Sequence, residues 1–294
     1  MYAAKSEERN AWRFYVPMMQ ADARQRMLLA TELRQALVED EFQLAYQPSV
    51  EMRTGRIVAV EALLRWQHPR RGEVMPGEFI PIAESIGLIH RIDEWVMHAA
   101  CAQIRAWDAS NLPKIRVAIN VSARWFGHPG FVESVRHALL TNAVEPDRIV
   151  LEITEGAMLR LGEETERTMR ALQALGIGVA IDDFGTGYAS MAYLKLPSVA
   201  YLKIDRSFVT GLPESPNDAA ITTAMLAMAS SLGLTTIAEG IETEGQHEFL
   251  LRAGCQEGQG FLYSYPLPPS ALERMLRPKR QAGAKLKLVP PVRS

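Results

Sequence analysis

Acidic, amide and lysine side chains recur where short apolar segments of this chain end. Two adjacent aspartates, Asp182 and Asp183, follow the apolar run at 179–181. Similar positions near the ends of other apolar segments hold Glu61, Asn120, Glu152, Glu155, Lys203, Asp205, Glu239 and Gln259. Carboxylates are seldom buried without a partner, so this pattern predicts a site that gathers positive charge.

The residue types indicate which positive charge the site gathers. Carboxylate and amide oxygens are the ligands preferred by hard divalent cations such as Mg²⁺ or Mn²⁺. The six histidines share no metal-ligand spacing, and we interpret them as surface or helix residues. Two ions roughly 3.5–4 Å apart are a recurring arrangement for phosphodiester hydrolysis. Gly185 and Gly187, just after the aspartates, would let the next loop fold over such a site.

Eight short apolar segments are expected to be the strands that position these residues. Several are apolar on both faces, as in a buried parallel sheet. They lie at residues 42–48, 56–66, 114–122, 148–155, 177–184, 200–205, 235–241 and 255–261. Helical patterns between them stop at Gly176, Gly233 and Gly254, which we expect as C-caps, and Asp218 is expected to cap the start of one helix.

This alternation predicts an α/β fold, a (β/α)8 TIM-like barrel within residues ~31–277, a length typical of such barrels. An open doubly wound sheet is the alternative. The barrel is preferred because the polar residues recur around a ring, as at the C-terminal mouth where barrel enzymes keep their chemistry. No segment matches the glycine-rich phosphate-binding loops G-x-G-x-x-G or G-x-x-x-x-G-K-S/T.

Composition narrows the class of protein. The net charge is −2, which argues against a protein built to grip a nucleic-acid polymer. Cys101 and Cys255 lie in apolar contexts, as reduced core residues would in the cytosol. No apolar run reaches the ~20 residues of a membrane span, and no signal peptide is visible. We therefore expect a cytoplasmic location, with any membrane anchor of a longer protein lying in other domains.

Several motifs, in order along residues ~31–277, resemble those of the EAL-domain cyclic di-GMP phosphodiesterases. They are EALLRW at 61–66, YQP at 46–48, NVS at 120–122, LEITE at 151–155, IDDFGTGYAS at 181–190, LKIDRSFV at 202–209, IAEGIET at 237–243 and GQGFLYSYPLP at 258–268. The resemblance implies a barrel whose first strand is antiparallel to the rest. It also implies hydrolysis of cyclic di-GMP to linear pGpG with two Mg²⁺ or Mn²⁺ ions. We expect Ca²⁺ to inhibit, because it prefers more ligands at longer distances than Mg²⁺ tolerates.

The resemblance also assigns roles to residues. The first ion would be bound by Glu61, Asn120, Glu152 and Asp182. Asp182 would bridge to the second ion, which Asp183 and Glu239 would also bind, Glu239 directly or through water. Lys203 would orient the attacking water, and Glu239 is also a candidate general base. Gln259 would support this shell, and Glu155 would anchor the loop after Asp183. The substrate-binding residues would be Gln47, Leu63, Arg65, Asp93 and Asp205, with Arg65 suited to a phosphate oxygen.

Two positions depart from the motifs of the family. Tyr188-Ala189-Ser190 stands where the family commonly reads GYSS, so one hydroxyl is missing from the loop. Gln256 stands where an aspartate is frequent. Neither position is an expected ligand.

The ends of the chain differ from the barrel. Residues 1–15 resemble the end of a GGDEF diguanylate cyclase domain, so residues 1–30 are expected as a remnant of that domain and a linker helix. Residues 278–294 are expected as a basic tail. The resemblance further implies a homodimer, and upstream GGDEF and sensory domains in a longer protein. Two alternatives remain open: a catalytically inactive cyclic di-GMP receptor, and a proton-abstracting barrel of the enolase type.

Overall fold

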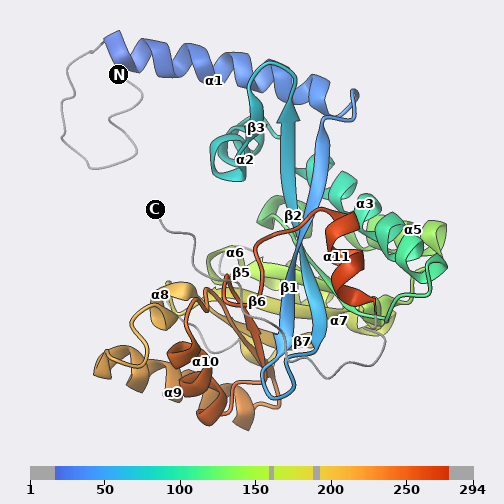
Figure 1. Ribbon diagram of the computed structural model, residues 1–294. Helices are drawn as coiled ribbons and strands as arrows, with labels where there is room; N and C mark the ends of the chain where they lie inside the picture. The colour runs from blue at the N-terminus through green and yellow to red at the C-terminus, as the bar shows by residue number, and fades with distance from the viewer. Residues whose placement is uncertain (1–16, 159–161, 188–192, 278–294) are drawn as a thin grey trace. The chain divides into compact units, whose positions relative to one another are not determined.

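The computed structural model describes residues 17–158, 162–187 and 193–277 (Figure 1). The strands are β1 Phe42–Glu51, β2 Ile57–His68, β3 Gly72–Val74, β4 Arg116–Asn120, β5 Ile149–Thr154, β6 Gly178–Phe184, β7 Val199–Ile204, β8 Thr235–Ala238 and β9 Glu257–Gln259. The helices are α1 Pro17–Ala36, α2 Pro76–Ser85, α3 Ile89–Ala109, α4 Ala123–Phe126, α5 Phe131–Asn142, α6 Glu155–Met158, α7 Gly162–Leu175, α8 Arg206–Val209, α9 Pro216–Ser231, α10 Glu244–Arg252 and α11 Pro269–Leu276, with short 3-10 turns at Pro146–Arg148 and Tyr193–Lys195.

Eight of the strands close into a barrel, which confirms the predicted fold. The hydrogen-bonded order is β1-β9-β8-β7-β6-β5-β4-β2, and β1 pairs with β2 to complete the ring. Within the barrel, the neighbouring strands β2, β4, β5, β6, β7, β8 and β9 pair parallel to one another. Strand β1 is antiparallel to β9, with Ser49 opposite Gln259. The open sheet is therefore wrong. All eight predicted segments form strands, and the short β3, which the sequence did not predict, extends β2 as a hairpin.

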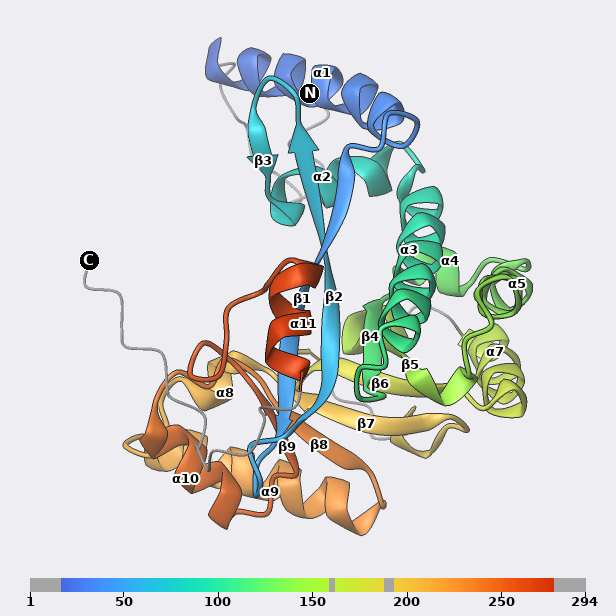
Figure 2. The same ribbon diagram turned by 45° about the vertical axis from the view of Figure 1, so that its right-hand side comes forward.

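Helices cover the outside of the barrel strands. Figure 2 shows α3, α5 and α7 gathered on the flank formed by β4, β5 and β6, with α9 and α10 beside β8 and β9. The interior holds a small core of Ala118, Val150 and Ala180, packed against Tyr201. Because the polar residues lie toward the carboxyl ends of these strands, this apolar layer forms the floor beneath them.

The predicted glycine stops are confirmed. Gly176, Gly233 and Gly254 follow α7, α9 and α10, and their φ angles are 86°, 71° and 92°, in the left-handed region that favours glycine. The expected cap at Asp218 is wrong. Helix α9 begins at Pro216, and the Ser215 hydroxyl accepts the backbone N–H of Asp218, which lies in the first turn. The motif Ser-Pro explains the difference, because proline suits the first helical position and serine the cap.

The chain divides into two compact units. The larger contains Gln43–Arg65 and Ile89–Ser294, and the smaller contains Met1–Phe42 and Trp66–Leu88. The expected domain boundaries at residues 30 and 277 stay predictions. Residues 1–16 and 278–294, which hold the expected cyclase remnant and basic tail, lie outside the described residues, as does Ala189.

His68, in the smaller unit, was expected to be a surface or helix residue. This expectation is wrong, because His68 is buried at the end of β2. Its Nε2 lies 3.2 Å from Glu32 Oε2, and its Nδ1 accepts the backbone N–H of Arg70 at 3.1 Å. Nδ1 therefore faces the backbone of Arg70 and Nε2 faces Glu32. The imidazole therefore fixes α1 to the end of β2 within this unit.

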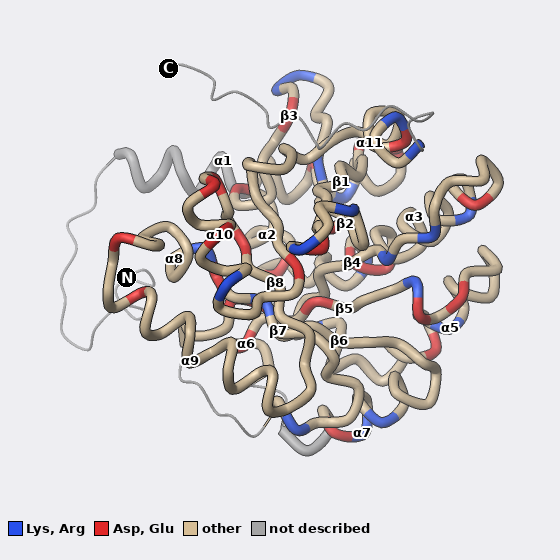
Figure 3. The backbone as a smooth tube through the Cα atoms, turned by 60° about the horizontal axis from the view of Figure 1, so that its bottom comes forward, with Lys and Arg blue, Asp and Glu red and all other residues tan. Residues whose placement is uncertain are grey.

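The described surface carries charges of both signs. Acidic and basic residues are interspersed along the tube in Figure 3. This distribution agrees with the small net charge of −2. None of the helices in the described part of the chain is long and apolar enough to span a membrane.

Candidate active site

The ammonium group of Lys203 lies at the centre of the polar cluster. Lys203, on β7, is 1 % exposed. Its Nζ lies 2.7 Å from Glu152 Oε2 and 2.7 Å from Glu239 Oε1. Asp182 Oδ1 is 3.2 Å away and Glu61 Oε2 is 3.9 Å away. Four carboxylates from four different strands or strand ends therefore converge on one cation, as the ring of polar residues predicts.

Amide side chains hold the carboxylate of Glu61 in place. Asn120 Nδ2 donates to Glu61 Oε1 at 2.7 Å, and Gln259 Nε2 donates to Glu61 Oε2 at 2.7 Å. Gln259 Nε2 also donates to Gln47 Oε1 at 3.1 Å, while its own oxygen accepts the Ser49 hydroxyl. Both oxygens of Glu61 are thus fixed by hydrogen bonds across the barrel. This arrangement fits the expected supporting role of Gln259.

The backbone at Asp183 explains how two adjacent carboxylates serve one site. Successive side chains of a regular strand point to opposite faces. Here the pairing of β6 with β7 shifts register between Ile181 and Phe184, and Asp183 adopts φ 52°. The Asp183 N–H donates to Asp182 Oδ1 at 2.9 Å. Oxygens of Asp182, Asp183 and Glu239 consequently lie within 4.8 Å of one another.

Glu155 supports the loop that follows Asp183. Glu155 begins α6 directly after β5 and is buried. Its Oε2 accepts the backbone N–H of Gly185 at 3.1 Å, and a Cβ on Gly187 would lie 3.6 Å from its carboxylate. Its other oxygen, Oε1, is buried and has no hydrogen-bond partner among the described residues. The contact agrees with the expected role of Glu155 as a loop anchor.

Burial and mutual repulsion perturb the protonation of this cluster. Burial raises the pKa of Glu152 well above its usual range, and it raises the pKa of Glu239 to about 7, against the opposing effect of Lys203. Burial, reinforced by the neighbouring Asp182, also raises the pKa of Asp183. Burial alone would lower the pKa of Lys203, but the carboxylates around it raise that pKa well above its ordinary value.

Glu61 shifts in the opposite direction. Burial tends to raise its pKa, but Lys203 and the hydrogen bonds from Gln259 and Asn120 outweigh burial and lower it. One lysine therefore does not neutralise all the acids, and Glu152, Asp183 and Glu239 still favour additional positive charge.

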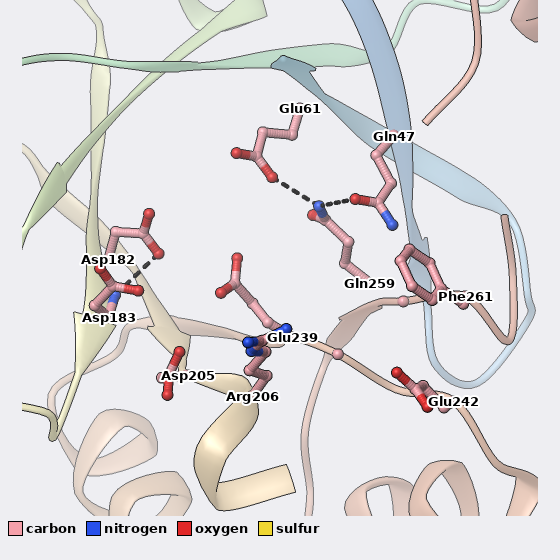
Figure 4. Close-up of a pocket in the computed structure, with 12 residues that line it drawn as sticks. Gln47, Glu61, Asp182, Asp183, Asp205, Arg206, Glu239, Glu242, Gln259 and Phe261 are labelled. Carbon is pink, nitrogen blue, oxygen red and sulfur yellow. Dashed lines mark hydrogen bonds between the residues drawn. The ribbon is translucent and has the colours of Figure 1, made fainter. Parts of the chain in front are cut away.

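A cavity of about 350 Å³ opens beside the cluster. Figure 4 shows Asp182 and Asp183 on one side of it, Gln47 and Phe261 on the other, and Glu239 between them. Its lining consists of Gln47, Glu61, Asp182, Asp183, Asp205, Arg206, Glu239, Gly240, Glu242, Gln259, Gly260 and Phe261. Seven of these were predicted as site residues from the sequence. Asn120, Glu152 and Lys203 are not among these lining residues, and they contact Glu61, Asp182 and Glu239 through the bonds described above.

Three predicted substrate-binding residues do not line the cavity: Leu63, Arg65 and Asp93. Arg65 Nη1 donates to the Leu64 carbonyl oxygen at 2.8 Å. Asp93 is buried on α3, where its carboxylate accepts the Ser122 N–H at 3.2 Å and the Ser122 hydroxyl. Contacts of these three residues with a substrate stay predictions.

Sequence reasoning missed Arg206, Glu242 and Phe261. Each lies within three residues of a predicted site residue: Arg206 follows Asp205, Glu242 comes three after Glu239, and Phe261 comes two after Gln259. Position just beyond a strand end was therefore a signal available for all three. The ring of Phe261 is 44 % exposed and stacks on Tyr265 with centroids 4.3 Å apart.

The donor set fits divalent cations. Among the described residues, one group of three or more potential ligands comes together, Asp182, Asp183 and Glu239, and all of its donors are carboxylate oxygens. Such ligands suit Mg²⁺ or Mn²⁺ rather than metals that prefer nitrogen or sulfur. No histidine takes part in this group, and both cysteines are buried and free.

Fold and site together define a barrel protein with a carboxylate-rich mouth. Residues 30–266 match the EAL domain family, and the chain belongs to this family. The predicted family membership is therefore confirmed over most of the barrel.

Relatives extend this finding. A bifunctional diguanylate cyclase/cyclic di-GMP phosphodiesterase of Pseudomonas aeruginosa, MucR, is 45 % identical over 272 residues, covering 92 % of this chain and 40 % of MucR. The cyclic di-GMP phosphodiesterase NbdA of the same organism is 39 % identical over 294 residues, covering 100 % of this chain and 37 % of NbdA. The chain thus spans about 40 % of the length of these curated relatives.

The solved structures agree with the sequence relatives. The phosphodiesterase of PaMucR in complex with c-di-GMP superimposes with a TM-score of 0.80 at 46 % identity, covering 83 % of this chain and 99 % of that one. The EAL domain of FimX from P. aeruginosa, bound to c-di-GMP, gives a TM-score of 0.73 at 26 % identity and covers 79 % of this chain and 93 % of that one.

Proposed function

We propose that this chain is a metal-dependent phosphodiesterase that hydrolyses cyclic di-GMP to linear pGpG and so ends second-messenger signalling. The observation that carries the proposal is the convergence of Asp182, Asp183 and Glu239 within 4.8 Å, beside the buried Lys203 and at the edge of a cavity. The relatives MucR and NbdA carry phosphodiesterase names, and the PaMucR structure holds c-di-GMP. Their similarity supports the same chemistry here.

The proposed roles follow from the contacts. Glu61, Asn120, Glu152 and Asp182 would hold one divalent cation, and Asp182, Asp183 and Glu239 a second. Two such ions, Mg²⁺ or Mn²⁺, supply Lewis-acid stabilisation of phosphate charge when bound. Lys203 keeps the carboxylates together and adds a fixed positive charge near the phosphate. Glu239 lines the cavity, and we propose that it accepts a proton from the attacking water.

Substrate binding and partners are also proposed here. Gln47 and Asp205 line the cavity, and we propose that they contact the nucleotide. A homodimer and an upstream GGDEF domain are proposed for the full-length protein; the bifunctional name of MucR and the partial coverage of the relatives support the latter. The free, buried cysteines support a cytoplasmic location.

One experiment tests the activity and separates it from the alternatives. The purified protein is incubated with cyclic di-GMP and Mn²⁺, with and without a chelator, and pGpG is followed by chromatography. We expect pGpG to form only with the metal. Binding of cyclic di-GMP without turnover would instead identify a receptor. Neither binding nor turnover would favour a different barrel chemistry, such as proton abstraction from a carboxylate substrate.

A further inference from the structure

Arg206 presents to the cavity a positive charge that forms no ion pair with any residue that the structure describes. It is the first residue of α8, its side chain is exposed, and it lines the cavity. Asp205, Glu239 and Glu242 line the same cavity, yet within the described chain the Arg206 guanidinium forms no ion pair or hydrogen bond with them. In Figure 4 the guanidinium projects beside Glu239, between the aspartate pair and Phe261. Because these acidic neighbours do not pair with it, the Arg206 guanidinium is available to bind an anionic ligand.

The local backbone fixes where Arg206 leaves the chain. Asp205 caps α8 by accepting the Ser207 N–H at 3.0 Å, which sets the direction of the first turn. Gly240 packs directly against it, because a Cβ on Gly240 would lie 2.5 Å from Arg206 Cβ. Gly240 also has φ 68°, a conformation that favours glycine. The backbone and Cβ of Arg206 are therefore fixed at the wall of the cavity.

The charges around the cavity show what Arg206 is needed for. Of the twelve described residues that line it, six are carboxylates, namely Glu61, Asp182, Asp183, Asp205, Glu239 and Glu242, and Arg206 alone is cationic. Lys203, which is not among the lining residues, is already ion-paired with Glu152 and Glu239. An anionic group placed beside Asp205 or Glu242 would meet repulsion unless a cation faced it.

A cyclic dinucleotide brings two such groups, because it carries two phosphodiesters. One of them must lie at the carboxylate cluster to be cleaved. The other stays intact and still carries a negative charge. Arg65, expected from the sequence to bind phosphate, does not line the cavity, and its Nη1 donates to the Leu64 carbonyl oxygen. A planar guanidinium donates two parallel N–H bonds to phosphate oxygens, which makes Arg206 suited to the intact phosphodiester.

We propose that Arg206 binds the phosphodiester of the cyclic dinucleotide that is not being cleaved, by donating hydrogen bonds to its non-bridging oxygens. The inference rests on the proposed function and deepens it, because it assigns a binding residue for the second phosphate. Arg206 would touch the substrate away from the reacting atoms. Its loss should therefore raise KM rather than lower kcat.

The test compares two substrates with the same guanines. One is cyclic di-GMP, and the other is cyclic di-GMP in which one phosphodiester is replaced by a neutral methylphosphonate, leaving one cleavable linkage. KM and kcat are measured for wild type, Arg206→Gln, Arg206→Lys and the control Arg136→Gln. Arg136 is an exposed residue of α5, remote from the cavity lining.

We expect Arg206→Gln to raise KM for cyclic di-GMP by about 10- to 100-fold, the range for a lost hydrogen bond to a charged group. Wild type should lose a similar factor on the methylphosphonate, whereas Arg206→Gln should treat both substrates alike. Arg206→Lys should recover part of the loss, and Arg136→Gln should match wild type.

Two results would overturn the proposal: an unchanged KM in Arg206→Gln, or an equal loss on both substrates, which would assign the contact to a base or sugar. Failure of the proposed function would show separately, as wild type that does not cleave cyclic di-GMP.

Discussion

The carboxylate of Glu155 accepts a hydrogen bond from the backbone N–H of Gly185 at 3.1 Å. This bond ties the start of α6 to the loop that begins two residues after Asp183. The position of Asp183, a proposed ligand of the second ion, therefore depends on the side chain of Glu155 at the end of the neighbouring strand β5. Small displacements at such a position matter, since about 1 Å of misplacement can cost roughly a hundredfold in rate.

Replacing Glu155 should weaken the site without unfolding the barrel. Glu155→Ala removes the acceptor for Gly185, and we expect turnover and second-ion affinity to fall by about 10- to 100-fold, as for other residues that orient metal ligands. Glu155→Gln keeps an oxygen acceptor and should recover most of the loss. Calorimetric titration with Mn²⁺ and thermal melts provide the measurements. Unchanged Mn²⁺ affinity in a folded Glu155→Ala would show that the bond only caps a turn.

Gly185 itself should tolerate no side chain. Its φ is 96°, and a Cβ there would lie 2.9 Å from the Phe208 ring and would also meet Met225. Gly254 has φ 92° with nothing within 4 Å, so Gly254→Ala is the matched control for backbone strain alone. Both variants should lose about 1–3 kcal/mol of stability. We expect only Gly185→Ala to lose turnover; equal rates for the two variants would contradict this prediction.

Glu61 is expected to be essential for hydrolysis. Glu61→Ala removes a proposed anionic ligand that both Asn120 and Gln259 hold in position, and we expect turnover to fall by roughly 100-fold or more. Binding of cyclic di-GMP should weaken less, because Arg206 and Gln47 remain. Initial rates and equilibrium dialysis measure the two effects, and Glu133→Ala, at an exposed position of α5, is the control. Turnover within a few-fold of wild type would show that Glu61 is not a ligand.

Lys203 is predicted to stabilise the metal-free protein. Removal of a buried charge from its partners typically costs about 3–5 kcal/mol, and Lys203→Met leaves Glu152 and Glu239 without their shared cation. The Tm of Lys203→Met should therefore fall sharply in chelator and recover partly with Mn²⁺, which replaces the missing positive charge. Lys114→Met, which breaks the exposed pair with Glu145, should change Tm little. Equal Tm for wild type and Lys203→Met in chelator would contradict the prediction.

Calcium should occupy the carboxylate cluster and block turnover. Ca²⁺ prefers more ligands at longer distances than Mg²⁺ accepts. We expect Ca²⁺ to raise the Tm of the protein and to compete with Mn²⁺ in hydrolysis assays. Robust pGpG formation with Ca²⁺ as the sole divalent ion would be incompatible with the proposed geometry.

Local patterns in the sequence determined the elements and the chemical type of the site. The eight apolar runs became strands because their alternation with helices allows parallel pairing, and Gly176, Gly233 and Gly254 ended helices because only glycine readily takes left-handed φ values there. Polar residues at the ends of successive parallel strands lie together at one mouth when the strands close into a barrel. Their oxygen-only chemistry could also be predicted from residue type.

Only the tertiary structure determined how these polar side chains are arranged relative to one another. The left-handed Asp183 follows from a register shift between β6 and β7, and no local propensity encodes such a shift. The four carboxylates around Lys203 come from segments up to 178 residues apart, so their order around the cation depends on barrel closure. The sequence predicted Arg65 for phosphate binding, whereas Arg206 is the arginine that lines the cavity. Their different positions follow from the packing of Gly240 against one and the Leu64 carbonyl bond of the other, because a side chain's direction is set by its three-dimensional neighbours.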